Sequence, residues 1–154
     1  MRLQISTRLA IFAVLELTAR EGCQLSVADI GEKYGVSSHH LAKVMHVMGR
    51  AGLVRSVRGA GGGYQFAGNA RRTTLLEVAQ LFEDLSSVEQ RTGAVDATPE
   101  GQTLSEVLNE IDDIALATLG SITIATMRKL VDRRGTGGRR SKVAVSRQKN
   151  QSRL

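Results

Sequence analysis

Two short helical segments followed by a glycine-rich hairpin, between residues 26 and 66, constrain the fold of this chain more than any other feature. Ser26 is placed to cap a helix over Val27–Tyr34, and Asp29 stands where its side chain can bond back to the cap. Gly35 follows at a position suited to the left-handed turn that ends a helix. We therefore expect a short first helix with a defined start and end.

A second helix is expected from Ser38 to about Ala51, with Ser37 as its cap and Gly52 at its end. Its apolar positions recur at helical spacing and should face the core: Leu41, Val44, Met45 and Met48. Two short helices joined by a tight turn that contains glycine indicate a helix-turn-helix.

Strand-like residues 53–58 and 64–66 flank Gly59-Ala60-Gly61-Gly62-Gly63, which predicts a β-hairpin, and a hairpin directly after a helix-turn-helix is a wing. A phosphate-binding loop is the alternative for these glycines. It fails because no Gly-Lys-Ser/Thr follows and because the loop leads into a strand rather than a helix. The expected fold class is mainly α, with a small β-hairpin wing on a helix-turn-helix domain.

Such a domain places the N-terminal residues of its second helix over base edges in a major groove of DNA. Lys43 can donate to guanine or to phosphate, His39 to base or phosphate oxygens, and Ser38 can hold a phosphate. The other outward positions are His40, Ala42, which offers only an apolar contact, and His46. The alternative is that this is simply the solvated face of a small helix, and for His40 and His46 both interpretations stay open.

The wing supplies further candidate DNA contacts. Arg58, just before the glycine turn, can send its guanidinium into a narrow minor groove, where negative potential is concentrated. The backbone N–H groups of Gly61 and Gly62 can approach phosphates closely. Arg55 can pair with a phosphate or be an ordinary exposed strand residue. A metal site on the three histidines is not expected, because His46 is six or seven residues from the other two rather than three or four.

The N-terminal segment predicts a helix from about Thr7 to Arg20, capped by Ser6 and ended by Glu21-Gly22. Apolar residues occupy two of its faces, so it must be covered on two sides, and one cover could be another subunit. Its longest apolar stretch, Leu9–Leu17, is too short to span a bilayer. No cleavage site precedes Glu16, so we expect a cytoplasmic protein without a membrane partner.

Charge divides the chain into three blocks: residues 1–72 carry +6, residues 73–127 carry −9 and residues 128–154 carry +9. In the acidic block a long helix can begin at Pro99, be interrupted at Gly120 and be followed by a second helix over Thr123–Val131. Its apolar stripe comprises Leu104, Val107, Leu108, Ile111, Ile114, Ala115 and Leu119. We interpret the stripe as a dimer seam, with packing against the first helix of the same chain as the alternative.

These blocks suggest three regions: a winged helix-turn-helix domain over residues 1–85, a linker and dimerisation helices over 86–132, and a basic, disordered tail over 133–154. The tail could add nonspecific phosphate contacts or serve only as a solubilising end.

Three segments resemble the Rrf-two-type bacterial winged-helix regulators: MRLQISTRLAIFAVLEL, LSVADIGEKYGVSSHHLAKVMHVMGRAGLVRSVRGAGGGYQFAG and TTLLEVAQLFEDL. The likeness covers about residues 1–131, and GLVRSVRGAGGGY is its most specific part. Its best-known groups are the iron–sulfur cluster regulator, the nitric-oxide-sensing repressor and the cysteine-metabolism repressor. The resemblance implies a homodimeric transcription factor that binds imperfect palindromes. It matches Lys43 to a recognition-helix lysine of the nitric-oxide-sensing group and Arg58 to the minor-groove arginine of the wing.

The chain departs from the cluster-carrying members of that family. They place three cysteines between the helix around Leu76 and the dimerisation helix, but residues 86–98 hold neither cysteine nor histidine. Where some members add an acidic ligand near the N-terminus, this chain has Arg8. A cluster needs about four thiolates or close substitutes, and Cys23 is the one cysteine. We therefore expect no iron–sulfur cluster, no other cofactor and no disulfide within the chain.

The resulting hypothesis is a sequence-specific transcriptional regulator of double-stranded DNA that acts as a homodimeric repressor. A sequence-indifferent, nucleoid-type DNA-binding protein is the alternative, which would explain the basic tail but not the wing. An enzyme is not expected, because all three histidines lie on the recognition helix and no paired carboxylates stand in an apolar context. The controlling signal stays open: reversible oxidation of Cys23, a small molecule or a protein partner, with a merely incidental Cys23 as the alternative.

Overall fold

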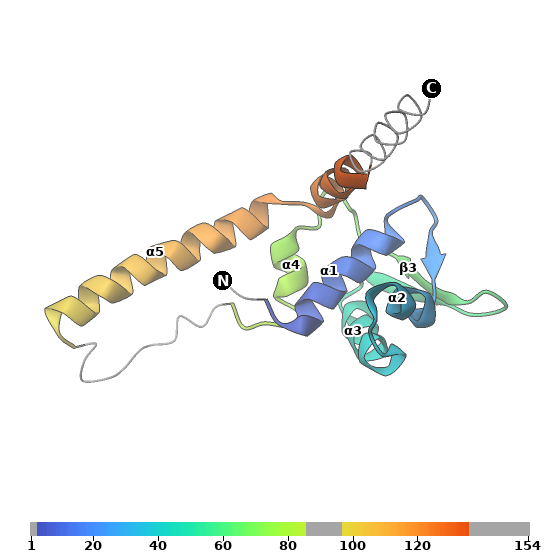
Figure 1. Cartoon of the computed structure of the whole chain (residues 1–154), viewed down its shortest axis with the longest axis horizontal. Coiled ribbons are helices and arrows are strands. Elements are labelled where there is room, and N and C mark those ends of the chain that lie inside the picture. The colour runs from blue at the N-terminus through green and yellow to red at the C-terminus, as the bar shows by residue number, and fades with distance from the viewer. Residues whose placement is uncertain (1–2, 86–96, 136–154) are drawn as a thin grey trace, which may run out of the picture.

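The computed structural model of the chain describes residues 3–85 and 97–135 (Figure 1). In chain order the elements are α1 (Ile5–Leu17), β1 (Gln24–Leu25), α2 (Val27–Tyr34), α3 (Ser38–Arg50), β2 (Val54–Val57), β3 (Gly63–Phe66), α4 (Leu75–Ala79) and α5 (Pro99–Ser121). Residues 124–135 form a further helix. Helices α1 to α4 gather with the sheet, and α5 extends away from them as a long arm (Figure 1).

Helix α1 begins and ends earlier in the chain than the sequence predicts, at Ile5 and at Leu17. Its N-cap is Gln4, which makes no side-chain capping bond, so the expected cap at Ser6 is wrong. A residue far along the chain provides the missing cap: Oε1 of Glu83 accepts a hydrogen bond from the backbone N–H of Gln4 at 2.8 Å. A carboxylate at this end of a helix also interacts favourably with the helix dipole.

The two helices of the helix-turn-helix have the predicted caps. Ser26 and Asp29 form a capping box at the start of α2, and Gly35 ends that helix with φ of 64°. The hydroxyl of Ser37 accepts a hydrogen bond from the backbone N–H of His40 at the start of α3. The four residues expected to face the core are all buried: Leu41, Val44, Met45 and Met48.

The wing is part of a three-stranded antiparallel sheet rather than an isolated hairpin. Strand β3 lies in the middle, with β2 on one side and β1 on the other. Strand β1, which the sequence analysis missed, pairs Gln24 with Gln65 and Leu25 with Tyr64. It attaches the wing to the segment between α1 and α2.

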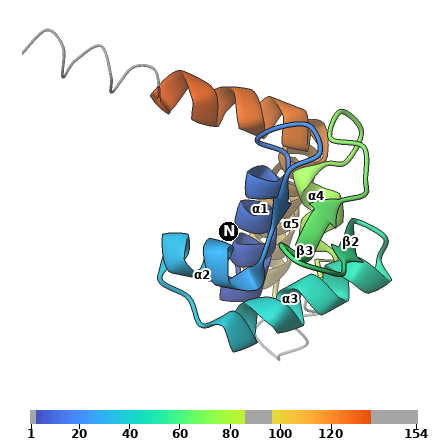
Figure 2. The same cartoon turned by 90° about the vertical axis from the view of Figure 1, so that its right-hand side faces the viewer.

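Helix α1 forms the centre of the core, and the chain itself covers both of its apolar faces. It contacts α3, α4, β1 and β3, and in Figure 2 these elements surround it, with the helix of residues 124–135 lying across its C-terminal end. Its buried side chains are Thr7, Leu9, Ala10, Ile11, Ala13, Val14, Leu15 and Leu17. Another subunit is therefore not needed to cover α1, contrary to one expectation above.

Helix α5 begins at Pro99, as predicted, and continues through Gly120 to Ser121. The chain is extended at Ile122, whose carbonyl accepts a hydrogen bond from the Leu75 N–H at 2.9 Å. Ile124, at the start of the next helix, is fully buried. This short connection anchors the base of the arm to the winged domain.

The final helix continues past residue 132, where the sequence places the start of the tail. The linker and tail residues 86–96 and 136–154 lie outside the described residues. Within the described ranges, none of the helices has the length and apolar character needed to span a membrane.

Candidate nucleic-acid interface

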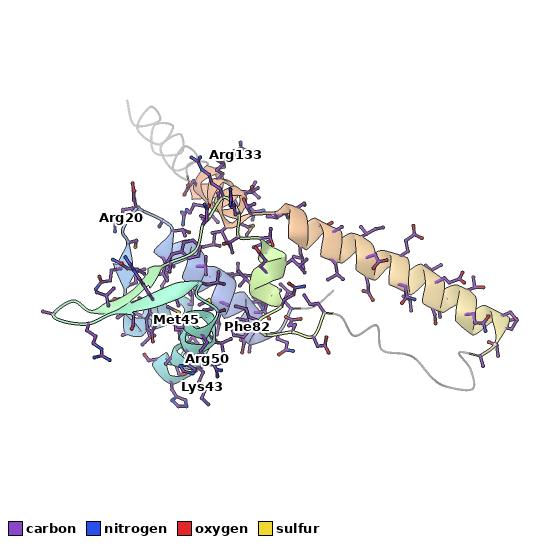
Figure 3. All side chains as sticks on the ribbon, turned by 180° about the vertical axis from the view of Figure 1, so that it is seen from behind. Arg20, Lys43, Met45, Arg50, Phe82 and Arg133 are labelled. Atoms are coloured by element: carbon purple, nitrogen blue, oxygen red, sulfur yellow. The ribbon has the colours of Figure 1, made fainter. Side chains whose placement is uncertain are left out.

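Helix α3 presents one buried face and one exposed face. Ser38, His39, Lys43 and His46 are exposed, whereas Ala42 is half-buried. Figure 3 shows Lys43 reaching outward from the domain, while Met45 lies inside it. Since α3 carries no acidic residue and Arg50 adds a cation in its last turn, its exposed face suits a polyanion.

His40 differs from the neighbouring candidates because its ring is half-buried. Its Nε2 lies 3.3 Å from Oγ of Ser6, within hydrogen-bond distance. The side chain that the sequence assigned as a cap of α1 therefore interacts with the first turn of α3. This contact holds His40 against α1, whereas His39 and Lys43 extend into solvent.

The tip of the wing is a tight glycine turn next to Arg58, which is exposed. Gly61 has φ of 73°, a conformation that favours glycine. A Cβ on Gly62 would lie 2.8 Å from the carbonyl oxygen of Val57 and 2.9 Å from that of Gly59. The tight turn expected from the sequence therefore requires these glycines, whether or not their backbone also approaches phosphates.

A row of polar side chains crosses the exposed face of the sheet. The guanidinium of Arg55 donates from Nη2 to Oε1 of Gln65 at 2.9 Å and from Nε at 3.2 Å. Gln65 in turn interacts with Gln24 at 3.4 Å, and the Gln24 amide donates to the carbonyl of Gly61 at the wing tip. Arg55 is therefore held by Gln65, a partner that the sequence analysis did not identify. Only the pairing of β1 with β3 brings Gln24 into this row.

A second polar cluster fixes α2 on α1. Nζ of Lys33 lies 2.5 Å from Oε1 of Glu16, and the Tyr34 hydroxyl donates to the same oxygen at 2.6 Å. Partial burial alone would raise the pKa of Glu16, but these two hydrogen bonds hold that pKa below its ordinary value. Burial, together with the bond to Glu16, raises the pKa of Tyr34. The ring of Tyr34 also stacks on Phe12, with 5.0 Å between centroids. The helix-turn-helix is thus held firmly by the core helix.

Cys23 lies half-buried in the turn before β1. In residues 3–85 and 97–135 no group of three or more histidine, cysteine, aspartate or glutamate side chains is arranged to hold a metal ion. The histidines of α3 and the thiol of Cys23 therefore do not form a common metal site in the described part of the chain.

The chain is similar to known regulators over most of its length. The Rrf2 family model, described as "Iron-dependent Transcriptional regulator", matches residues 3–129. A protein of Rhodopseudomonas palustris named as the HTH-type transcriptional regulator BadM is 48% identical over 132 residues, which cover 86% of this chain and 84% of that protein.

Two solved structures are similar to this chain over most of its length. CymR (YrzC), the global cysteine regulator of B. subtilis, superposes with a TM-score of 0.73 and 25% identity, over 84% of this chain and 98% of CymR. T. potens IscR gives a TM-score of 0.63 and 26% identity, over 85% of this chain and 88% of IscR.

These matches confirm the winged-helix fold and the family resemblance of the sequence. The relatives are transcriptional regulators rather than enzymes. The family model spans the helix-turn-helix, the wing and α5 alike. The chain therefore belongs to the Rrf2 family of DNA-binding transcriptional regulators.

Proposed function

We propose that this regulator is a homodimeric repressor that binds an imperfect DNA palindrome without an iron–sulfur cluster. The observation that carries the proposal is the exposed face of α3, which offers Ser38, His39 and Lys43 and no carboxylate. Arg58 stands exposed on the adjoining wing. A recognition helix in the major groove and an arginine in the minor groove together read sequence and shape.

The remaining candidate residues have supporting roles in this proposal. The backbone N–H of Gly61 approaches a phosphate at the wing tip, whereas the N–H of Gly62 already donates to the carbonyl of Gly59 at 2.9 Å. Arg55, on β2, is the remaining candidate for a phosphate contact. His40, held by Ser6 at 3.3 Å, positions the first turn of α3 rather than reading a base.

A second copy of the chain is the partner that best fits α5. Four apolar side chains on this helix are about half exposed: Leu104 at 57%, Val107 at 49%, Ile111 at 55% and Ile114 at 60%. Full burial of a side chain of this kind contributes about 1.5–3 kcal/mol. Pairing α5 with its symmetry mate would bury the stripe, as the apolar seam predicts.

A twofold dimer would present two α3 helices to DNA about 34–36 Å apart, one helical turn, so its operator would be a palindrome. The exposed acidic residues of α5 are Glu106, Glu110, Asp112 and Asp113. Their negative charge would repel phosphate and confine the contact with DNA to the winged domains. Occupying a promoter in this way would block transcription.

The donor set of the chain does not fit an iron–sulfur cluster. A cluster needs about four thiolates or close substitutes, while each chain supplies one thiol, Cys23. That thiol lies in the turn before β1, beside the wing sheet and not on α5. We infer that iron sensing through a bound cluster, which some relatives of the family perform, does not extend to this chain.

A sequence-indifferent DNA-binding protein remains the alternative, and one measurement separates the two. Affinities for a promoter fragment containing the mapped palindrome and for a scrambled fragment are compared at the same salt concentration. A specific regulator should prefer the palindrome by about a thousandfold or more. Equal affinities for the two fragments, both for the wild type and for a variant without Arg58, would establish a sequence-indifferent DNA-binding protein.

A further inference from the structure

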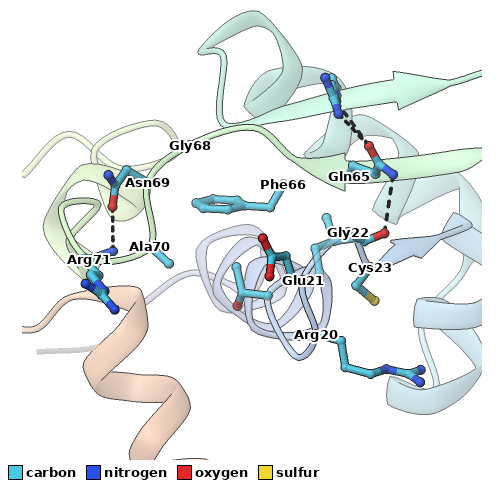
Figure 4. Close-up of a pocket in the computed structure, with 13 residues that line it drawn as sticks. Arg20, Glu21, Gly22, Cys23, Gln65, Phe66, Gly68, Asn69, Ala70 and Arg71 are labelled. Atoms are coloured by element: carbon cyan, nitrogen blue, oxygen red, sulfur yellow. Dashed lines mark hydrogen bonds between the residues drawn. The ribbon is translucent and has the colours of Figure 1, made fainter.

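An open cavity of about 750 Å³ lies beside the wing, and of the proposed DNA-contacting residues Arg55 alone is among its lining residues. Its walls are the turn between α1 and β1, the exposed face of the sheet, and residues 66–71 (Figure 4). The ring of Phe66 forms an apolar part of the lining and lies so close to Gly68 that a Cβ there would be 2.9 Å from Cζ of the ring. The cavity has the volume of a small-molecule site.

The charges around this cavity are mostly positive. Arg20, Arg55 and Arg71 line it, opposed by the single carboxylate of Glu21. All four side chains are exposed to solvent. Within the described residues the side chains of Arg20 and Arg71 make neither a hydrogen bond nor an ion pair, so their donors are available to a ligand. Guanidinium groups bind carboxylates and phosphates through paired, charge-assisted hydrogen bonds.

Arg20 and Arg71, unlike Arg55, lie outside α3 and the wing, the elements proposed to contact the operator. Figure 3 shows Arg20 and Lys43 at opposite ends of the domain. Because α3 and the wing tip are the expected DNA-binding elements, a positive cavity near the C-terminal end of α1 calls for a different anion. Its mixed lining, with guanidinium groups around Phe66, suits a small organic anion better than a polymer backbone.

We propose that this cavity binds a small organic anion bearing a carboxylate or phosphate group, and that the bound anion alters operator affinity. The second part rests on the proposed function. Arg55 connects the two sites, since it lines the cavity and belongs to the row that runs through Gln65 and Gln24 to the carbonyl of Gly61. A charged ligand oxygen is a stronger acceptor than the amide oxygen of Gln65. An anion on Arg55 therefore loosens the row that holds the wing tip, next to Arg58.

Anion binding is measured first on the full chain without DNA, by calorimetry and thermal shift with four probes: succinate, citrate, inorganic phosphate and glycerol 3-phosphate. At least one probe should bind saturably, and whether the carboxylates or the phosphates do so identifies the group recognised. Arg71→Gln should weaken that binding about tenfold or more, because it removes a charge-assisted contact.

Two further variants sharpen this test. Arg72→Gln, which removes the same charge from the neighbouring residue outside the lining, should leave the affinity unchanged. Glu21→Gln should tighten binding, because it removes the one carboxylate in the lining. The site is overturned if no probe binds saturably, or if Arg71→Gln and Arg72→Gln reduce the affinity equally.

The link to the wing is tested separately, with the operator and a probe that binds. Operator affinity should change severalfold when the cavity is saturated, and Gln24→Ala should abolish that change while still binding the anion, because Gln24 belongs to the row but not to the lining. If saturating the cavity with the anion does not change the affinity of the wild type for the operator, the connection through Arg55 is refuted, although the anion site itself is not. If the wild type shows no operator preference at all, the proposed function fails instead.

Discussion

The hydroxyl of Thr7 donates a hydrogen bond to Oε1 of Glu83 at 2.5 Å, across 76 residues of the chain. Thr7 is completely buried in α1, and the same carboxylate oxygen accepts the backbone N–H of Gln4. One side chain from beyond α4 thus satisfies a buried hydroxyl and caps the core helix.

Glu83→Ala should therefore destabilise the winged domain by about 1–3 kcal/mol, because the hydroxyl of Thr7 and the N–H of Gln4 would both lose their acceptor. Urea unfolding followed by circular dichroism measures the change. Glu106→Ala is the matched control, since it removes an exposed carboxylate on α5 and should change stability little. Equal stability of the two variants would show that the capping contact contributes nothing.

The lowered pKa of Glu16 predicts that the free energy of unfolding depends on pH in the acidic range. Its folded pKa lies below the ordinary value of 4.5, so on acidification the unfolded chain binds the proton first. The stability that Glu16 contributes is present above that value and is lost as the pH falls through the folded pKa. The difference in unfolding free energy between wild type and Glu16→Gln should thus shrink as the pH is lowered below 4.5.

Tyr34→Phe provides the companion variant, since it removes one of the two hydrogen-bond donors to Glu16. It should weaken this pH dependence without abolishing it, because Lys33 remains. A difference between wild type and Glu16→Gln that stays constant with pH would mean that the cluster does not favour the ionised carboxylate.

Lys43→Ala tests whether α3 reads bases. If Lys43 contacts guanine, the substitution should cost about 1–3 kcal/mol against the preferred base pair and relax selectivity at that position only. If Lys43 touches phosphate alone, all sequences should weaken equally. Fluorescence anisotropy with a set of singly altered operators distinguishes these cases. Lys129→Ala removes a lysine from the far side of α1, on the last helix, and should leave both affinity and selectivity intact.

Arg58→Ala should weaken operator binding and relax the preference for an A·T-rich step where the wing meets the minor groove. Arg58→Lys keeps the charge but lacks the planar guanidinium, so it should restore affinity more than selectivity. Binding to operators that differ only at that step provides the measurement. An alanine variant with wild-type affinity and preference would exclude Arg58 from the interface.

Ile111→Glu should dissociate the proposed dimer, because it places a charge in the middle of the apolar stripe of α5. The side chain is 55% exposed in the single chain, so the folded domain itself should tolerate the change. Sedimentation velocity should show a monomer with weakened operator binding. Glu110→Gln, one residue away on the acidic side, should remain dimeric; if both variants stay dimeric, the seam lies elsewhere.

Sequence reasoning succeeded where the determinants are local. Ser26 with Asp29, Ser37, Gly35 and Pro99 fix helix ends through contacts within a few residues, and each was predicted at its observed place. The arrangement of Lys43 and Arg58 on exposed surfaces follows from the same local patterns.

The misses depend on contacts between distant segments. The start of α1 depends on Glu83 and not on Ser6, and no spacing rule links Glu83 to Gln4. Strand β1 has two residues, too few to give an alternating pattern of apolar and polar positions. The sequence therefore did not indicate that Gln24 pairs with Gln65. The cavity arises only after α1, the sheet and residues 66–71 have packed together.

The extended residue Ile122 has a geometric consequence for any operator. It attaches the base of α5 to α4, while the apolar stripe runs along α5 from Leu104 to Ile114. Each residue of an α-helix turns it by about 100° and lengthens it by about 1.5 Å. In the proposed dimer, one residue inserted between the stripe and Ile122 would turn each winged domain by about 100° relative to the seam, so the length of α5 would set the spacing of the half-sites.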